Sequence, residues 1–280
     1  MKISFHNHSV FSDGSDTMQD MLSCAYNEGF THFAMTDHIH SDQTPQWTVT
    51  YDRYEEYLNE IKRFKDMYDG KMKIYTGIEA DWYNGEGTYY GRYESLAGKL
   101  DITLGSVHNL LANGGNYIID GSRSDFEECL YFGFYGNIKD MVACYYESYM
   151  EMAENFTQAD LLCHIDLIRK NNAGNAYYDE DEKWVKDLEK ALAKKMGMYD
   201  RVTEINGGGA YRKKNDVYYP SCRLIEYLKN ENVRFTIGLD AHSTEMVKGY
   251  YDASISYAKK AGIDTLYVFN DGKWSEAESL

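Results

Sequence analysis

The feature that most constrains the fold is the regular alternation of short apolar segments with longer segments of helical periodicity. Strand-like segments occupy residues 2–6, 31–37, 72–79, 101–108, 160–166, 201–207, 234–240 and 265–270. Helical periodicity is found at residues 16–27, 52–68, 137–158, 181–196, 221–231 and 245–261. Strands that alternate with helices in this way form parallel sheets covered by helices. The sequence therefore predicts an α/β barrel or a doubly wound sheet.

Local signals favour a barrel and a single domain. No glycine-rich phosphate-binding loop follows the first strand, as a doubly wound nucleotide-binding sheet would require. The 280 residues contain only two prolines and no linker-like or repeated segment. We therefore expect one domain over residues 1–270, followed by a short C-terminal tail, 271–280. Less regular stretches are expected to form long loops at one end of the barrel, where binding residues usually lie, at 40–51, 81–100 and 109–136.

Composition argues against several classes of protein. The formal net charge is −16 and no basic stripe is present, which argues against a nucleic-acid partner. No run of about 18 apolar residues occurs, and the amino terminus lacks the apolar core of a signal peptide. Five cysteines without a CxxC spacing indicate reduced thiols. We expect a cytoplasmic acidic protein with no membrane or nucleic-acid partner.

Histidines and carboxylates gather at the ends of the predicted strands. Seven of the eight histidines stand near or just after a strand end: His6, His8, His38, His40, His108, His164 and His242. Carboxylates occupy matching positions: Asp13, Asp37, Glu79, Glu204 and Asp240. In a β/α barrel the carboxyl ends of all strands meet at one face. These residues are therefore expected to converge, although they are far apart in the sequence.

The chemistry of this set indicates metal ions. Residues i and i+2 of a strand point to the same side, so His6 and His8 are placed to bind one ion. The same spacing relates Asp240 and His242. Burying so many imidazoles and carboxylates without a metal would carry a large desolvation cost. Imidazole and carboxylate are ligands of zinc, manganese and iron, and this set exceeds what one ion uses. The sequence therefore predicts a multinuclear metal site.

Seven segments also resemble a known family. They are, in order, FHNHSVFSDG, MTDH, GIEADW, LGSVHNL, LLCHIDLIRK, VTEINGGGAYRK and GLDAHS. They resemble the motifs of the PHP (polymerase and histidinol phosphatase) superfamily from residue 4 to about residue 250. The resemblance implies a distorted (β/α)7 TIM-like barrel that holds three divalent metal ions, zinc, manganese or iron. Within the superfamily, the chain is most similar to the free-standing enzymes that hydrolyse L-histidinol phosphate in histidine biosynthesis.

The resemblance implies nine metal ligands. The first metal would be held by His6, His8, Glu79 and Asp240. Glu79 would also bridge to a second metal, completed by His108 and His164. The third metal would be held by Asp13, His38 and His242.

Further residues are predicted to serve the reaction. Phosphate monoesters hydrolyse very slowly, so the site must supply a nucleophile and neutralise charge. Clustered ions do both, and we expect direct attack by metal-bound hydroxide without a phosphoenzyme. Arg169 is expected to contact the phosphate through its planar guanidinium. His40 is a candidate phosphate contact or leaving-group acid, and Arg212 and Lys213 are further phosphate contacts. Glu204 is expected to orient a histidine or relay a proton.

Other functions remain open at this point. Asp37 is expected to orient a histidine. The predicted metal ligands do not distinguish one phosphorylated small substrate from another. Phosphotyrosine, nucleotides and sugar phosphates are the alternatives to histidinol phosphate. An amide hydrolase on a similar barrel would usually need a lysine at a strand end, and Lys62, Lys71 and Lys73 lie elsewhere. A non-catalytic metal-binding protein would normally have a closed site with fewer ligands.

Overall fold

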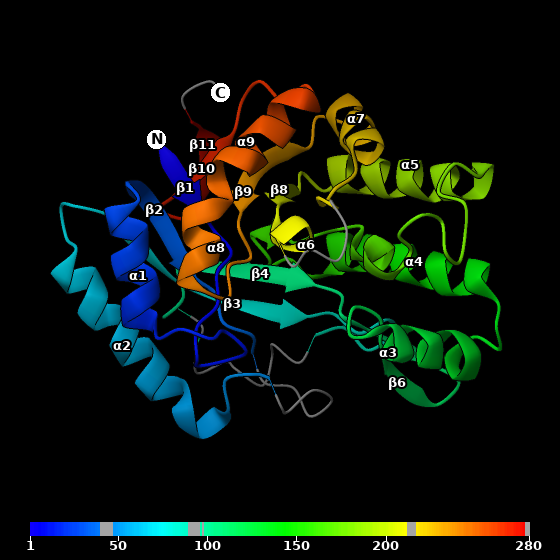
Figure 1. Ribbon diagram of the computed structural model, residues 1–280, viewed down its shortest axis with the longest axis horizontal. Helices are drawn as coiled ribbons and strands as arrows, with labels where there is room; N and C mark the ends of the chain where they lie inside the picture. The colour runs from blue at the N-terminus through cyan, green and yellow to red at the C-terminus, as the bar shows by residue number, and fades with distance from the viewer. Residues whose placement is uncertain (40–46, 89–95, 97, 212–216, 278–280) are drawn as a thin grey trace.

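The barrel consists of seven parallel strands. The computed structural model describes residues 1–277 apart from 40–46, 89–95, 97 and 212–216 (Figure 1). The strands, in their order around the sheet, are β1 (Lys2–Ser4), β2 (Phe30–Met35), β3 (Lys73–Asp81), β4 (Ile102–Ser106), β7 (Leu161–Leu162), β8 (Val202–Asn206) and β9 (Arg234–Gly238). Backbone hydrogen bonds between the segments after β1 and around the end of β9 nearly close the sheet, from Phe5 N to Ile237 O (3.0 Å) and from His8 N to Ala241 O (2.9 Å). The expected distorted TIM-like barrel is confirmed.

Helices cover the outside of these strands (Figure 1). They are α1 (Met18–Asn27), α2 (Tyr54–Met67), α4 (Ile138–Asn155), α5 (Lys183–Met198), α7 (Cys222–Asn230), α8 (Thr244–Gly249) and α9 (Tyr251–Lys260). Thr17 caps α1 by accepting a hydrogen bond from Asp20 N. The single helix predicted at 245–261 is two helices, because α8 ends at Gly249, a residue with low helix propensity. No helix in the described ranges is long and apolar enough to cross a membrane.

The region predicted as a loop at 109–136 contains regular structure. β5 (Asn109–Ala112) and β6 (Gly115–Ile118) form an antiparallel hairpin. Its turn residues Asn113 and Gly114 have positive φ angles of 46° and 75°, as the favoured two-residue hairpin turn requires. The short helix α3 (Arg123–Glu128) and the π-helical turn η3 (Cys129–Gly133) follow. Three more short elements are η1 (Tyr51–Arg53), η4 (Leu167–Asn171) and α6 (Gly208–Tyr211).

Tyrosines replace part of the fifth barrel strand. β7 is much shorter than predicted, and the chain leaves it at His164, whose φ is 25°. Two buried hydroxyls from α4 then satisfy backbone groups that a longer strand would have paired. Tyr149 donates to Cys163 O (2.9 Å), and Leu167 N donates to the Tyr145 hydroxyl (2.8 Å). Buried backbone groups need such partners, so the aromatic core holds the segment around His164 in place.

The C-terminal residues form a hairpin at the amino-terminal end of the barrel. β10 (Tyr267–Asn270) pairs with β11 (Lys273–Glu276) and not with the parallel sheet. Regular structure therefore extends beyond the expected domain boundary at residue 270. The Trp274 ring lies 5.4 Å from that of Phe5 and 5.0 Å from that of Phe269. Its indole N–H donates to Asp160 O (3.0 Å), which anchors the hairpin to the barrel.

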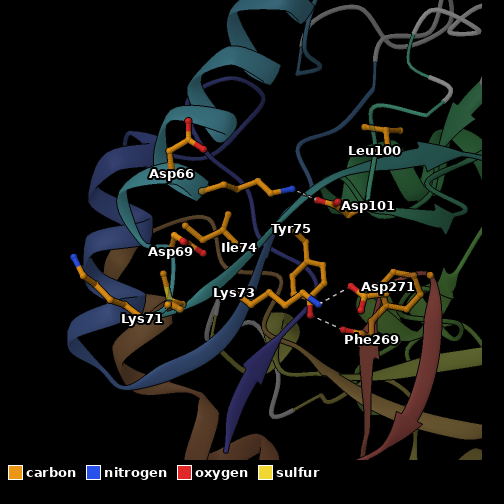
Figure 2. Close-up of a pocket in the computed structure, with 14 residues that line it drawn as sticks. Asp66, Asp69, Lys71, Lys73, Ile74, Tyr75, Leu100, Asp101, Phe269 and Asp271 are labelled. Carbon is orange, nitrogen blue, oxygen red and sulfur yellow. Dashed lines mark hydrogen bonds and ion pairs between the residues drawn. The ribbon is translucent and has the colours of Figure 1, made fainter.

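A large cavity of about 1040 Å³ lies beside this hairpin (Figure 2). Figure 2 shows Lys73 reaching Asp271 (3.1 Å) and the Tyr75 hydroxyl reaching Phe269 O (2.5 Å). These contacts join the start of β3 to the hairpin. In β/α barrels this end contributes stability, whereas active sites lie at the opposite end. We therefore assign the cavity no role in the chemistry.

The hairpin contacts predict a stability effect. Replacing Trp274 with alanine removes its ring contacts and its hydrogen bond, so we expect a loss of about 2–3 kcal/mol in the free energy of unfolding. Ser275→Ala, at an exposed position of the same strand, is the matched control and should change it by less than about 0.5 kcal/mol. Urea unfolding at equal metal content measures both. Equal stability of the two variants would contradict the anchoring role.

Candidate metal centre

The Glu79 carboxylate lies at the centre of the candidate site. It stands on β3, is 1% exposed, and is surrounded by five imidazoles. One oxygen, Oε2, faces ring nitrogens at 3.0, 3.4 and 3.2 Å, those of His6, His8 and His38. The other, Oε1, faces ring nitrogens at 3.1 and 3.5 Å, those of His164 and His108. A carboxylate whose two oxygens face separate sets of imidazoles is placed to bridge two ions.

A second group of donors lies beside this carboxylate. His242 Nε2 is 3.1 Å from Asp13 Oδ2, and Asp13 Oδ1 is 3.8 Å from nitrogens of both His8 and His38. Asp240 Oδ1 is 3.3 Å from His8 Nε2. The nine predicted ligands thus fall into overlapping groups whose donor atoms lie within 4.8 Å of one another: His6, His8, Asp13, His38, Glu79, His108, His164, Asp240 and His242. Their roles as ligands stay a prediction.

His8 tests whether these residues fit a metal ion. Its side chain is fully buried, and neither ring nitrogen makes a well-aligned hydrogen bond within the described part of the chain, although carboxylate oxygens of Asp240 and Glu79 lie 3.3 and 3.4 Å from Nε2. Burial, together with neighbouring His242 and His38, lowers the pKa of His8 to about 3, so the ring is neutral at pH 7. A buried polar atom without a partner costs free energy. A divalent cation would satisfy a lone pair on this ring, and the donor set fits such an ion.

Two buried carboxylates contact imidazoles of the predicted ligand set from the side away from Glu79. Both Glu204 oxygens, on β8, lie 3.1 Å from His6 Nδ1. Asp81 Oδ1 lies 2.6 Å from His108 Nδ1. Such contacts fix the ring tautomer and leave Nε2 to face the cluster. Glu204 is fully buried and does not line the cavity above the cluster, so it is positioned to orient His6 rather than to meet a substrate.

Asp81 is not among the site residues predicted from the sequence. The signal was its i+2 spacing from Glu79, which places both side chains on the same face of β3. Asp37 makes other contacts than the one expected. Among the described residues its carboxylate forms no hydrogen bond or ion pair with a histidine side chain, and it accepts hydrogen bonds from the backbone and hydroxyl groups of Ser9 and Ser12. Asp37 therefore fixes the first loop, which carries Asp13.

A cavity of about 360 Å³ opens above the cluster. Seven of the nine predicted ligands line it: Asp13, His38, Glu79, His108, His164, Asp240 and His242. Its walls include Trp47, Asp120, Lys170 and Tyr219. Lys170 Nζ lies 3.0 Å from Asp120 Oδ2. The cluster is therefore open to a small molecule, and the described cavity wall places the Lys170 ammonium beside it.

Arg169 does not line the described part of this cavity, contrary to expectation. Its Nε donates to Glu180 (2.9 Å) and its Nη1 to Asp166 (3.1 Å), and it is absent from the described cavity lining. These two carboxylates hold the guanidinium, whereas the next residue, Lys170, lines the cavity. This arrangement does not support the predicted phosphate contact by Arg169. Three more residues predicted to serve the reaction, His40, Arg212 and Lys213, lie outside the described residues.

The buried carboxylates change the protonation of the histidines. Burial alone would lower the pKa of His108, but Asp81 and Glu79 raise it to about 10. Glu204, Glu79 and Asp240 likewise raise the pKa of His6 against the effect of burial. Histidine binds a metal through a neutral ring nitrogen, so an entering ion must displace these protons.

This protonation predicts proton release. Adding zinc to the chelator-treated protein at pH 8 should release a proton from His108, because pH 8 lies below its pKa of about 10. Asp81→Asn removes the carboxylate that raises this pKa most, while Glu79 remains, and this variant should release less. Calorimetry in buffers of different ionisation enthalpy measures the release, and equal release by both proteins would contradict the assignment. The raised pKa also stabilises the metal-free fold below pH 6.5, and this stabilisation is lost as the pH rises towards about 10.

A glycine of β9 allows the close approach of Glu204 and His6. A Cβ atom on Gly238 would lie 1.7 Å from Glu204 Oε2 and 3.0 Å from His6 Cβ. Gly238→Ala should therefore displace Glu204 and lower zinc affinity by about tenfold to a hundredfold, as expected for loss of a contact to a ligand. The control is Gly249→Ala, where nothing lies within 4 Å of the added atom. Zinc titration with a competing chelator measures both, and wild-type affinity in Gly238→Ala would refute the packing argument.

Comparisons with known proteins agree with this architecture. A Schizosaccharomyces pombe protein named "probable histidinol-phosphatase" is 25% identical over 97% of this chain and 90% of its own length. Bacillus subtilis histidinol-phosphatase is 22% identical over 89% of this chain and 96% of its own length.

Two crystal structures share the fold. One, from Listeria monocytogenes and named for histidinol phosphatase, has a TM-score of 0.80 at 19% identity, covering 90% of this chain and 99% of that chain. The other, Lactococcus lactis histidinol phosphate phosphatase with zinc, L-histidinol and phosphate, has a TM-score of 0.65 at 18% identity, covering 98% of both chains. Residues 4–206 match the model of the PHP domain family. Because this match spans more than half of the sequence, the chain belongs to the PHP domain family.

Proposed function

We propose that the protein is a metal-dependent phosphomonoester hydrolase that converts L-histidinol phosphate to L-histidinol and phosphate. The observation that carries this proposal is the buried carboxylate–imidazole cluster around Glu79 at the floor of an open cavity. Membership of the PHP family supports the chemistry. The substrate is supported by relatives that are named histidinol-phosphatase and by the Lactococcus lactis structure, which contains zinc, L-histidinol and phosphate.

The arrangement of donors supports three divalent ions. One ion would use His6, His8, Glu79 and Asp240. A second would share Glu79 and add His108 and His164. A third would use Asp13, His38 and His242. Zinc, manganese and iron all suit imidazole and carboxylate donors.

Charge balance supports a need for metal. The described lining contains five carboxylates, those of Asp13, Glu79, Asp120, Asp125 and Asp240. Among the lysines and arginines, this described lining contains only Lys170. A phosphate dianion would be repelled by this set of charges. Bound divalent ions would neutralise phosphoryl oxygens and lower the pKa of a coordinated water.

The chain's own residues orient the reaction. The Lys170 ammonium lies in the cavity wall, and its positive charge suits a phosphoryl oxygen. Glu204 and Asp81 hold His6 and His108 in one tautomer. No serine, threonine or cysteine is present among the described lining residues, which supports transfer of the phosphoryl group directly to water.

The decisive experiment measures phosphate release from L-histidinol phosphate beside O-phosphotyrosine, a nucleotide and a sugar phosphate. The protein is loaded separately with zinc, manganese or iron. We expect a strong preference for histidinol phosphate, with kcat/KM above about 10⁴ M⁻¹s⁻¹. Weak activity spread over the whole panel would reject this substrate, and no release from any monoester would reject the hydrolase itself.

The bridging role of Glu79 gives a separate prediction. Glu79→Gln keeps the shape of the side chain but removes its charge, so bound metal should fall by more than one equivalent and phosphate release by at least about a hundredfold. Glu60→Gln, on the outer surface of α2, should keep full metal content and activity. Elemental analysis of dialysed protein, together with the phosphate assay, measures both. Full metal content with full activity in Glu79→Gln would rule out the bridge.

A further inference from the structure

The cavity contains an ion pair that the proposed metal ligands do not use. Lys170 lies on η4, and Asp120 lies shortly after the end of β6. Lys170 Nζ is 3.0 Å from Asp120 Oδ2. Their side chains are only 13% and 21% exposed. Both residues line the cavity together with His108 and His164. Burial alone would raise the pKa of Asp120, but Lys170, and after it His108, lower that pKa to about 2. The pair therefore lies beside the metal-binding end of the cavity, and its carboxylate is ionised at pH 7.

Neighbouring backbone contacts fix the position of this pair. Ile119, directly before Asp120, donates its N–H to His108 O (2.9 Å). Asn171, directly after Lys170, donates its side-chain N–H to Ile119 O (3.3 Å). Both charged residues are thus tied to the segment that carries a predicted metal ligand. A substrate whose phosphate lies at the cluster would therefore meet both charges.

Opening this pair has a cost that depends on the substrate. A phosphate group that attracts Lys170 draws it from Asp120, and a half-buried carboxylate left without a cation is destabilising. A substrate that carries its own cation removes this penalty, because its cation can take the place of Lys170. A monoester without a cation pays the full penalty. Such an unpaired group is an effective basis for discrimination.

We propose that the Asp120–Lys170 pair selects monoesters that carry an ammonium group close to the phosphate. Lys170 binds the phosphoryl oxygens, and Asp120 binds the ammonium of the leaving group. The inference deepens the proposed function and rests on it, since L-histidinol phosphate carries its amino group on the carbon next to the phosphorylated CH₂. Asp120 is thus a specificity residue, and it forms no covalent bond with the substrate.

The test compares L-histidinol phosphate with 3-(imidazol-4-yl)propyl phosphate, which lacks only the amino group. The wild-type protein should favour the first in kcat/KM by about tenfold to a hundredfold, the usual effect of a charged hydrogen bond. Asp120→Asn should reduce this ratio to near one, and Asp120→Glu should restore part of it. The matched control is Glu154→Gln, which removes a carboxylate from the surface pair with Lys195 and should keep the wild-type ratio.

The outcomes separate this inference from the proposed function. A wild-type protein that hydrolyses histidinol phosphate while Asp120→Asn keeps the full ratio would overturn the inference alone. Phosphate release from neither compound by the wild type would overturn the proposed function as well. Should Asp120→Asn fail to fold, inhibition of the wild type by L-histidinol and by 3-(imidazol-4-yl)propan-1-ol gives the same comparison. At least about tenfold tighter inhibition by L-histidinol supports the inference, and equal inhibition overturns it.

Discussion

The burial of Glu79 is the constraint on which the rest of the site depends. An ionised carboxylate at the centre of a barrel is strongly destabilising unless cationic or hydrogen-bonding partners surround it. Five imidazoles supply those partners here, and they come from four different strand ends. The strands must therefore end at the same level around β3. A barrel meets this requirement because the carboxyl ends of its strands share one face.

A second layer of contacts makes this arrangement specific. Glu204 and Asp81 each contact the outer nitrogen of an imidazole predicted to bind metal, and Asp37 holds the loop that carries Asp13. Tyrosine hydroxyls also fix the backbone near the site. The Tyr57 hydroxyl from α2 contacts Gly77 O (2.8 Å) and Asp37 N (3.2 Å), which connects the end of β2 to β3. Polar groups on aromatic side chains thus let a well-packed core also determine where strands end.

The sequence predicts the parts of this structure that follow from periodicity and strand position. Alternating strands and helices imply the barrel, and the histidines at strand ends imply the cluster. Local chemistry that depends on tertiary contacts is not accessible in this way. Arg169 and Lys170 are adjacent on a 3₁₀ turn; Asp166 and Glu180 hold Arg169, whereas Asp120 pairs with Lys170 in the cavity wall. Similarly, the β5–β6 hairpin lay within a predicted loop, although its Asn113-Gly114 turn was a readable signal.

The acidic character of the chain is consistent with the proposed chemistry once the cavity is considered by itself. With a net charge of −16 and five lining carboxylates, the protein alone would repel a phosphate ester. Divalent ions would reverse the charge only at the cluster and leave Asp120 negative near it. The cavity would then present a cationic floor beside an anionic wall. Such a surface would complement a zwitterionic monoester better than a simple anion, so the acidity of the cavity wall would favour an amine-bearing substrate.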